Sequence, residues 1–298
     1  LNGQLMDVML RDMEKDCGKS ADPARPWEVW NAACEVKEAG EKWGRKDPEY
    51  SQVLTPYRGE VFGTDALNTV IQRYIRGIGE DSVGDAYRLA IDGIMLRDKV
   101  IQIRNRPKSD PIYAYDRQAD KCVPVEVFNG ELGFVKAHGF DTDKLKWKGF
   151  RPERFQVQFA RKEHLWVGYG SDLGRNEEGR WIKKQNVEDN LELAYAISVH
   201  KAQGSEFRRV YLIVPKHKRT LLSPELFYTG LTRAKVHCTL LIEEDITPLL
   251  EMRRREASHL QRINSSLFEF RPLPPEVVAR TDWHKEGRIY HTLTEAMV

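Results

Sequence analysis

Apolar residues recur with the period of a helix at the start of the chain. Leu5, Met9 and Met13 share one helical face, and Val8 lies beside them. After a break at residues 23–26 the same spacing returns. This second set consists of Trp27, Trp30, Ala33 and Val36. We therefore predict a helical N-terminal segment over residues 1–45.

From residue 46 the pattern changes to that of a parallel α/β domain. Residues 51–57 have the composition of a short buried strand that runs into Arg58 and Gly59. Thr64 or Asp65 then caps a helix. The predicted apolar face of this helix consists of Leu67, Val70, Ile71 and Ile75. A strand, a Gly-containing turn and a helix form the repeating unit of a parallel sheet.

The same pattern returns after residue 190. Residues 194–198, 209–214 and 237–242 are predicted strands, and Ser223 followed by Pro224 is a typical helix start. We therefore predict an α/β fold. Its parallel sheet, flanked by helices, is built from residues 46–108 and 190–250.

Residues 109–189 differ from both flanks. Short β-like runs alternate there with turns, which predicts a small barrel or sandwich inserted into the sheet. Asn129-Gly130 is a predicted hairpin turn between runs at 124–128 and 133–136. Residues 141–153 and 170–179 are predicted loops. The insertion is rich in aromatic residues, for which barrel core is favoured over base stacking by roughly three to one. They are Tyr113, Trp147, Trp166, Tyr169 and Trp181.

Composition adds little to this picture. With 41% hydrophobic and 31% charged residues the chain is an ordinary globular protein, and its net charge of +2 does not indicate a nucleic-acid binder. The sequence has no membrane-span-like run, signal peptide or metal-ligand spacing of its cysteines, which favours a cytoplasmic protein without a membrane partner. A start at Leu1 suggests an excised piece, and residues 251–298 are a predicted basic helical and linker tail.

Residues 198–207 place polar groups directly after a predicted strand, where open α/β sheets bind ligands. Gly204 lets the backbone approach a partner closely, while Gln203 and Glu206 offer hydrogen-bonding groups. If only Gly204 and Glu206 were present, a strand-turn with incidental polar residues would be the simpler interpretation.

The complete string, however, resembles motif V of superfamily 1 helicases. The matching residues are Ser198, His200, Lys201, Gln203, Gly204, Ser205, Glu206 and Phe207. The resemblance implies that Gly204 and Glu206 face the nucleotide. It also implies that Ser198, His200 and Gln203 face single-stranded DNA.

Residues 226–235 predict a helix that ends in Thr232, Arg233 and Lys235, and the positive charges of Arg233 and Lys235 suit the helix dipole. Cations that merely close a helix would explain this segment if it stood alone. It also resembles motif VI of the same family, with Gly230 where Ala is more usual. By that resemblance Arg233 is the arginine finger that stabilises charge on the γ-phosphate during its transfer.

Two further stretches, 52–68 and 98–133, resemble the start of the second motor domain in RecD-like helicases and its entry into an SH3-like insertion. The implied fold is a RecA-like parallel sheet interrupted by an SH3-like barrel. The resemblance suggests that Thr55, Arg58 and Asn68 lie near the DNA backbone. Arg58 could equally be a structural ion-pair partner.

The sequence contains no Gly-x-x-x-x-Gly-Lys-Ser/Thr loop and no paired acids of the family's Mg²⁺-binding motif. We therefore expect ATP and Mg²⁺ to be shared with a first RecA-like domain upstream, with no metal ligand in this chain. Single-stranded DNA is the expected second partner. The chain alone should be catalytically inactive. The alternative is a non-catalytic binding module for nucleic acid or protein, possibly from a helicase–nuclease fusion.

Overall fold

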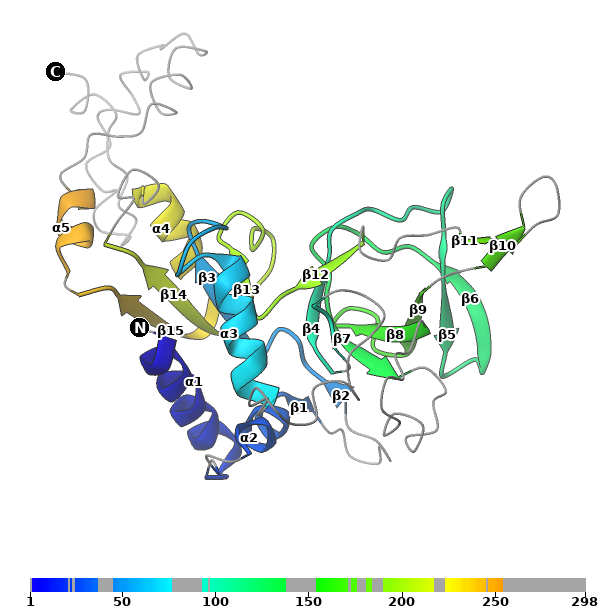
Figure 1. Cartoon of the computed structure of the whole chain (residues 1–298), viewed down its shortest axis with the longest axis horizontal. Helices are drawn as coiled ribbons and strands as arrows, with labels where there is room; N and C mark the ends of the chain where they lie inside the picture. The colour runs from blue at the N-terminus through cyan, green and yellow to red at the C-terminus, as the bar shows by residue number, and fades with distance from the viewer. Residues whose placement is uncertain are drawn as a thin grey trace, which may run out of the picture. The chain divides into compact units, whose positions relative to one another are not determined.

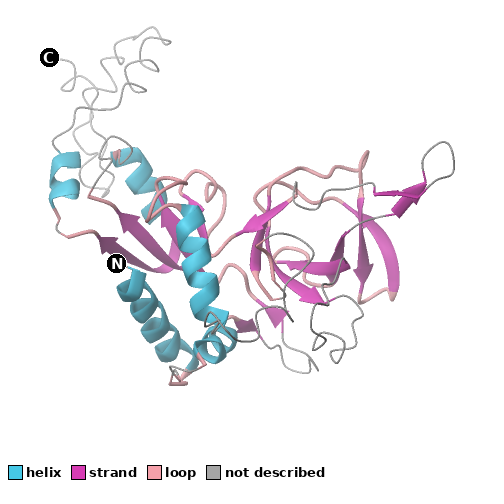
Figure 2. Ribbon diagram, in the orientation of Figure 1, coloured by secondary structure: helices cyan, strands magenta, loops and turns pink. Residues whose placement is uncertain are grey.

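The computed structural model describes residues 2–20, 22, 25–36, 45–76, 93–95, 97–137, 154–170, 173–175, 181–183, 190–216, 223–244 and 246–253. Within these ranges the chain forms a four-stranded parallel sheet and a seven-stranded antiparallel sheet, shown in Figures 1 and 2. The predicted α/β class is confirmed. No described helix is long and apolar enough to cross a membrane.

The parallel sheet has the strand order β13-β3-β14-β15. The strands are β3 (Ser51–Thr55), β13 (Ala196–Ser198), β14 (Phe207–Val214) and β15 (Ala234–Ile242). Every adjacent pair is parallel, and every residue of β3 is buried. A central strand buried on both faces needs side chains that avoid water throughout, which Val53 and Leu54 provide.

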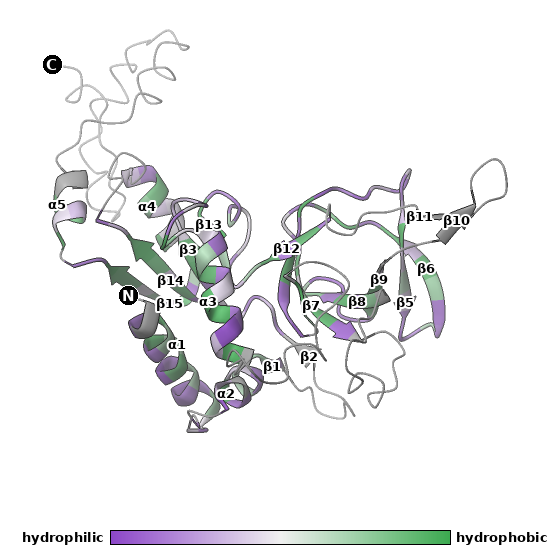
Figure 3. Ribbon diagram, viewed as in Figure 1, coloured by the Kyte–Doolittle hydropathy of each residue, from purple (hydrophilic) through white to green (hydrophobic). Residues whose placement is uncertain are grey.

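Helices cover both faces of this sheet. Apolar residues of α1 (Asn2–Cys17), α2 (Pro26–Ala33) and α3 (Thr64–Arg76) form one cluster with Val53, Tyr211 and Ile213. Leu226 and Phe227 of α4 (Pro224–Leu231) pack against the cluster on the other face, which contains Leu212. In Figure 3 the helix α1 carries hydrophobic and hydrophilic stripes, as expected for a helix with one buried side.

The helix α4 begins as predicted. The Ser223 side chain accepts a hydrogen bond from the Leu226 amide at 3.1 Å, and Pro224 occupies the first turn. Gly230 lies so close to β14 that an added Cβ would be 3.0 Å from a side-chain carbon of Leu212. The glycine therefore allows α4 to approach the sheet closely.

The antiparallel sheet has the strand order β12-β4-β7-β8-β9-β5-β6. Its members are β4 (Lys99–Gln102), β5 (Ile112–Asp116), β6 (Lys121–Val125), β7 (Leu132–Ala137), β8 (Arg154–Phe159), β9 (Leu165–Gly170) and β12 (Leu191–Leu193). A β-rich insertion is thus present. Among the described residues no ladder joins β12 to β6, so closure into an SH3-like barrel stays a prediction.

Several local predictions were wrong. Gly130 has a φ of 96° in a turn, but the strands around it are not a hairpin, because β6 pairs with β5 while β7 pairs with β4 and β8. Val36 ends the short strand β1 (Glu35–Val36), paired with β2 (Arg45–Lys46), instead of continuing α2. Part of the predicted loop 170–179 is β10 (Leu173–Arg175), which pairs with β11 (Trp181–Lys183).

The boundaries of the antiparallel sheet also differ from the expected 109–189. Both β4 and β12 belong to it and pair with each other, although they fall in the segments expected to form the parallel sheet. Of the insertion's aromatic residues, Tyr169 is in the core and Tyr113 is 61% exposed. Trp147, the predicted loop 141–153 and all of the tail beyond α5 (Thr247–Arg253) lie outside the described residues.

A buried polar cluster joins the two sheets where the chain leaves and re-enters the parallel one. The Gln52 amide nitrogen donates to the carbonyls of Ala194 and Tyr195, both at 3.0 Å. Its amide oxygen accepts from Lys99 Nζ at 2.8 Å, and the Ser51 carbonyl accepts from the same ammonium at 2.7 Å. Burial lowers the pKa of Lys99 to about 8.

The loop before α3 is equally constrained. The amides of Thr64 and Asp65 donate to the carbonyls of Tyr57 and Arg58, both at 3.2 Å, so the loop folds back on the helix start. A Cβ at Gly63 would lie 2.1 Å from the carbonyl oxygens of Arg58 and Gly59, which only glycine avoids.

We expect Gly63→Ala to lower the melting temperature by about 5 °C or more, because the loop must open to admit the methyl group. Gly59→Ala is the matched control, since open space surrounds that position. Scanning calorimetry compares the two. Equal melting temperatures would contradict the close approach at Gly63.

A charged contact attaches α1 to β14. Arg209 donates from Nε and Nη2 to the two oxygens of Asp16 at 2.7 and 2.6 Å, and the Tyr50 hydroxyl donates to the same carboxylate at 2.6 Å. The hydrogen bond from Arg209 is the main cause that lowers the pKa of Asp16 from 3.8 to about 2.

We expect Asp16→Asn to lower the free energy of unfolding by about 2 kcal/mol at neutral pH. Because the folded-state pKa is depressed, the carboxylate stabilises the fold above its unfolded-state pKa and loses this effect as the pH falls through about 2. The difference in the free energy of unfolding between wild type and variant, measured with urea, should therefore narrow below about pH 4. Asp7→Asn, on the exposed side of α1, should show no such difference.

Candidate functional site

The ends of two adjacent parallel strands bring the candidate residues together. Thr55 of β3 and Ser198 of β13 are register partners, and both are the last residues of their strands. Because the strands run in the same direction, the loops that follow them leave the sheet at one edge. Ligands bind at this edge in open α/β sheets.

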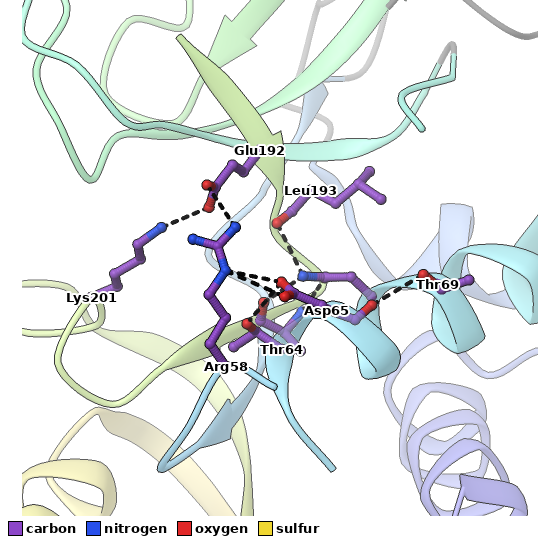
Figure 4. Close-up of polar contacts among 9 residues, drawn as sticks. Arg58, Thr64, Asp65, Thr69, Glu192, Leu193 and Lys201 are labelled. Atoms are coloured by element: carbon purple, nitrogen blue, oxygen red, sulfur yellow. Dashed lines mark hydrogen bonds and ion pairs between the residues drawn. The ribbon is translucent and has the colours of Figure 1, made fainter. Parts of the chain in front are cut away.

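A cavity of about 430 Å³ lies at this edge and receives side chains from both loops and from the antiparallel sheet. Four charged residues among those lining it form a continuous chain, shown in Figure 4. Arg58 Nε is 3.3 Å from Asp65, and Arg58 Nη2 is 3.2 Å from Glu192 Oε1. The other Glu192 oxygen is 2.7 Å from Lys201 Nζ.

Within this row of four charged side chains, Arg58 and Glu192 shift each other's pKa. Glu192 and then Asp65 raise the pKa of Arg58. Burial alone would raise the pKa of Glu192, but the hydrogen bond and charge of Lys201 and the charge of Arg58 outweigh it and hold this pKa below its usual range. Arg58 and Glu192 are thus both charged at neutral pH. The two cations lie where an anion could reach them, since their side chains are 65% and 39% exposed.

Of the predicted DNA contacts, the structure brings Arg58, Ser198 and the mostly buried Asn68 to this cavity. Ser198 is half-buried, and its hydroxyl accepts a hydrogen bond from the Lys201 amide at 3.2 Å. His200 is exposed in the turn that follows β13. Gln203, also exposed, lines a different cavity.

Thr55 and Asn68 are placed differently. Thr55 is fully buried, and its hydroxyl donates to the Phe62 carbonyl at 2.7 Å. Asn68 lines the cavity but is 7% exposed, and its amide group bonds both the carbonyl and the amide of Ala196 at 2.9 and 2.8 Å. Both side chains therefore support the loops and the strand β13 from within.

The second cavity, of about 440 Å³, separates the end of the 199–205 turn from loops of the antiparallel sheet. Gln203, Gly204 and Ser205 line one side. On the other, Arg161 Nη2 donates to the Gly204 carbonyl at 3.5 Å. Gly204 has a φ of 81° and no atom within 4 Å of its virtual Cβ, so the turn presents bare backbone.

Arg233 lies directly after α4 and folds back on it. Its Nε donates to the last-turn carbonyl of Thr229 at 3.1 Å, and Nη1 donates to the Ser205 carbonyl at 3.1 Å. Nη2 donates to the Thr232 hydroxyl at 3.2 Å. The guanidinium thus connects the two predicted motifs, with two of its five N–H groups left for another acceptor.

Glu206, predicted to face a nucleotide, is exposed and lies 3.7 Å from Lys235 Nζ. In the described residues no group of three His, Cys, Asp or Glu could hold a metal ion.

Sequence reasoning missed two members of the site. Lys201 was part of the matched motif but was assigned no role, although an exposed cation after a strand end was a usable signal. Glu192 carried no signal, because its importance comes from the pairing of β12 with β4, which no local pattern reveals.

Comparisons with known proteins agree with the motifs. The family model described as the UvrD-like helicase C-terminal domain matches residues 193–241. An ATP-dependent RecD2 DNA helicase of Deinococcus radiodurans is 30% identical over 222 residues, 73% of this chain and 24% of that protein. The RecD subunit of the Haemophilus influenzae RecBCD enzyme is 42% identical over 133 residues, 41% of this chain and 20% of that protein.

An uncharacterized protein, MJ1519 of Methanocaldococcus jannaschii, is 35% identical over 72% of this chain and 17% of its own length. The chain thus spans less than a quarter of each of these relatives. Among solved structures, the Pif1 helicase of Candida albicans aligns with 89% of this chain and 57% of that chain at 16% identity, with a TM-score of 0.38, too low to support any inference. From the family model, the RecD relatives and the two motifs, we conclude that this chain carries a superfamily 1 helicase C-terminal domain.

Proposed function

We propose that this chain is the second motor domain of an ATP-dependent DNA helicase. In this proposal it binds single-stranded DNA at the edge formed by the loops after β3 and β13. It also supplies Arg233 to an ATP site whose phosphate loop and Mg²⁺ ligands belong to another domain. The Deinococcus relative, named an ATP-dependent DNA helicase, supports this reaction class.

The observation that carries the DNA site is the convergence of Arg58 and Lys201 on one cavity, next to the Ser198 hydroxyl. Guanidinium and ammonium groups are the usual partners of DNA phosphates, and a hydroxyl adds a hydrogen bond. His200 and Gln203 extend this surface along the same turn. Thr55 and Asn68 act beneath it, because their polar groups are already bonded within the chain.

The proposed finger rests on the position of Arg233 between the motifs. Its bond to the Ser205 carbonyl holds the guanidinium beside Gly204 and Glu206, the residues expected to face the nucleotide. A planar group with a permanent charge suits the charge that develops on a transferred phosphoryl group. The same bond offers a path by which phosphate release could move the turn that contacts DNA.

We expect Arg58→Ala and Lys201→Ala each to weaken binding of a fluorescent oligothymidylate, measured by anisotropy. Each variant should also reduce the steepness of the salt dependence by about 0.7, because one phosphate contact is lost. Lys121→Ala removes an exposed cation from β6, outside both cavities, and should change neither quantity. Unchanged affinity in both site variants would exclude this DNA site.

In a protein that joins this chain to a phosphate-loop domain, Arg233→Ala should lower DNA-stimulated ATP turnover by about a thousandfold or more. DNA affinity should change little. Arg208→Ala, an exposed arginine of β14 that pairs with Asp16 at 3.9 Å, is the control. The 298-residue chain alone should show no turnover.

If Arg233→Ala retains full turnover, the arginine-finger role is wrong. DNA binding without any ATP dependence would then favour the binding-module alternative.

A further inference from the structure

Glu192 is the acidic centre of the candidate DNA site. Its two carboxylate oxygens contact different cations, Arg58 at 3.2 Å and Lys201 at 2.7 Å. The two cations come from separate loops of the parallel sheet, whereas Glu192 belongs to β12, an edge strand of the antiparallel sheet. Figure 4 shows the carboxylate reaching from that strand to both side chains.

This arrangement reproduces what a phosphate would do in the same place. A carboxylate and a phosphodiester both carry a negative charge and present two oxygens to guanidinium and ammonium donors. The cavity therefore holds a built-in anion where the proposed function requires a DNA phosphate. Asp65 offers Arg58 a second internal partner at 3.3 Å, but Lys201 has Glu192 as its ion-pair partner among the described residues.

We propose that Glu192 competes with DNA phosphate for Arg58 and Lys201 and so limits the affinity of this site for single-stranded DNA. The inference rests on the proposed function. Phosphate binding must first displace the carboxylate from at least one cation. Because the Glu192, Arg58 and Lys201 side chains are 31%, 65% and 39% exposed, their ion pairs are screened by water and weak enough to exchange.

The competition also connects DNA binding to the antiparallel sheet. The ion pairs that Glu192 makes link β12 to the two loops of the parallel sheet. A phosphate that takes over the cations breaks this link. DNA binding should therefore release the Glu192 side chain from the two loops, while the pairing of β12 with β4 and the buried contacts of Gln52 and Lys99 keep the sheets attached.

A purely positioning role for Glu192 makes the opposite prediction. In that case the carboxylate holds Arg58 and Lys201 in the geometry that DNA requires, and its loss weakens binding. The sign of the change in affinity therefore decides between competition and positioning.

The test is the affinity of the 298-residue chain and its Glu192→Gln variant for a fluorescent oligothymidylate over a range of salt concentrations. Glutamine keeps the size of the side chain and removes its charge. We expect affinity to rise about three- to thirtyfold, the range that the loss of two exposed ion pairs allows. The salt dependence should become steeper, since the freed cations now neutralise phosphate.

The matched control is Glu126→Gln. It removes the same charge from the antiparallel sheet region, where Glu126 accepts a hydrogen bond from the Lys108 amide and lines neither cavity. It should leave affinity unchanged, and an equal gain in both variants would overturn the proposal as an effect of net charge. Thermal unfolding establishes that each variant is folded. Glu192→Asp, which keeps the charge on a shorter side chain, provides a second variant with a smaller expected gain in DNA affinity.

A triple variant that adds Arg58→Ala and Lys201→Ala to Glu192→Gln should lose the gain. If Glu192→Gln weakens binding or leaves it unchanged while the two alanine variants weaken it, competition is wrong and the DNA site stands. If neither the wild-type chain nor Glu192→Gln binds DNA, the DNA site and the competition both fail.

Discussion

One buried amide determines how this fold accommodates its insertion. Gln52, in the fully buried strand β3, bonds the carbonyls of Ala194 and Tyr195 and also accepts from Lys99. The chain leaves the parallel sheet near Lys99 and returns near Ala194, so one side chain holds both points. A buried amide or ammonium without partners would be costly, and each completes the other's hydrogen bonds. The rest of the site depends on this junction, because it fixes where β12, and therefore Glu192, meets the loops.

The polar groups of the molecule fall into two classes with different physical roles. Gln52 and Asn68 are buried, and the Asp16 side chain is 16% exposed; all three satisfy defined partners and hold elements in place. Glu192 and Arg58 pair at the surface, where water competes and the energy of each contact is small. The first class gives the site its geometry. The second class leaves it able to exchange partners.

Local patterns in the sequence predicted much of the parallel sheet. Short runs with the composition of buried strands predict β3 and β14, and the Ser223-Pro224 start of α4 is a local signal that the structure reproduces. Pairing across the chain was not predictable in this way. Asn129-Gly130 has the turn chemistry of a hairpin, yet its flanking strands pair elsewhere because long-range contacts decide strand partners. The predicted DNA contacts Ser198 and Arg58 line one cavity, whereas the side chains of Thr55 and Asn68 are buried, a distinction that only packing reveals.

Gly230 has a consequence for the evolution of this domain. Its virtual Cβ would approach side-chain carbons of Leu212 at 3.0 and 3.1 Å, so the two positions share one volume between α4 and β14. Related chains that carry alanine in the helix should compensate with a smaller or differently shaped residue in the strand. Positions 212 and 230 should therefore covary. Because Arg233 follows Gly230 by less than one helical turn, such paired exchanges would preserve the distance between the Arg233 guanidinium and the sheet.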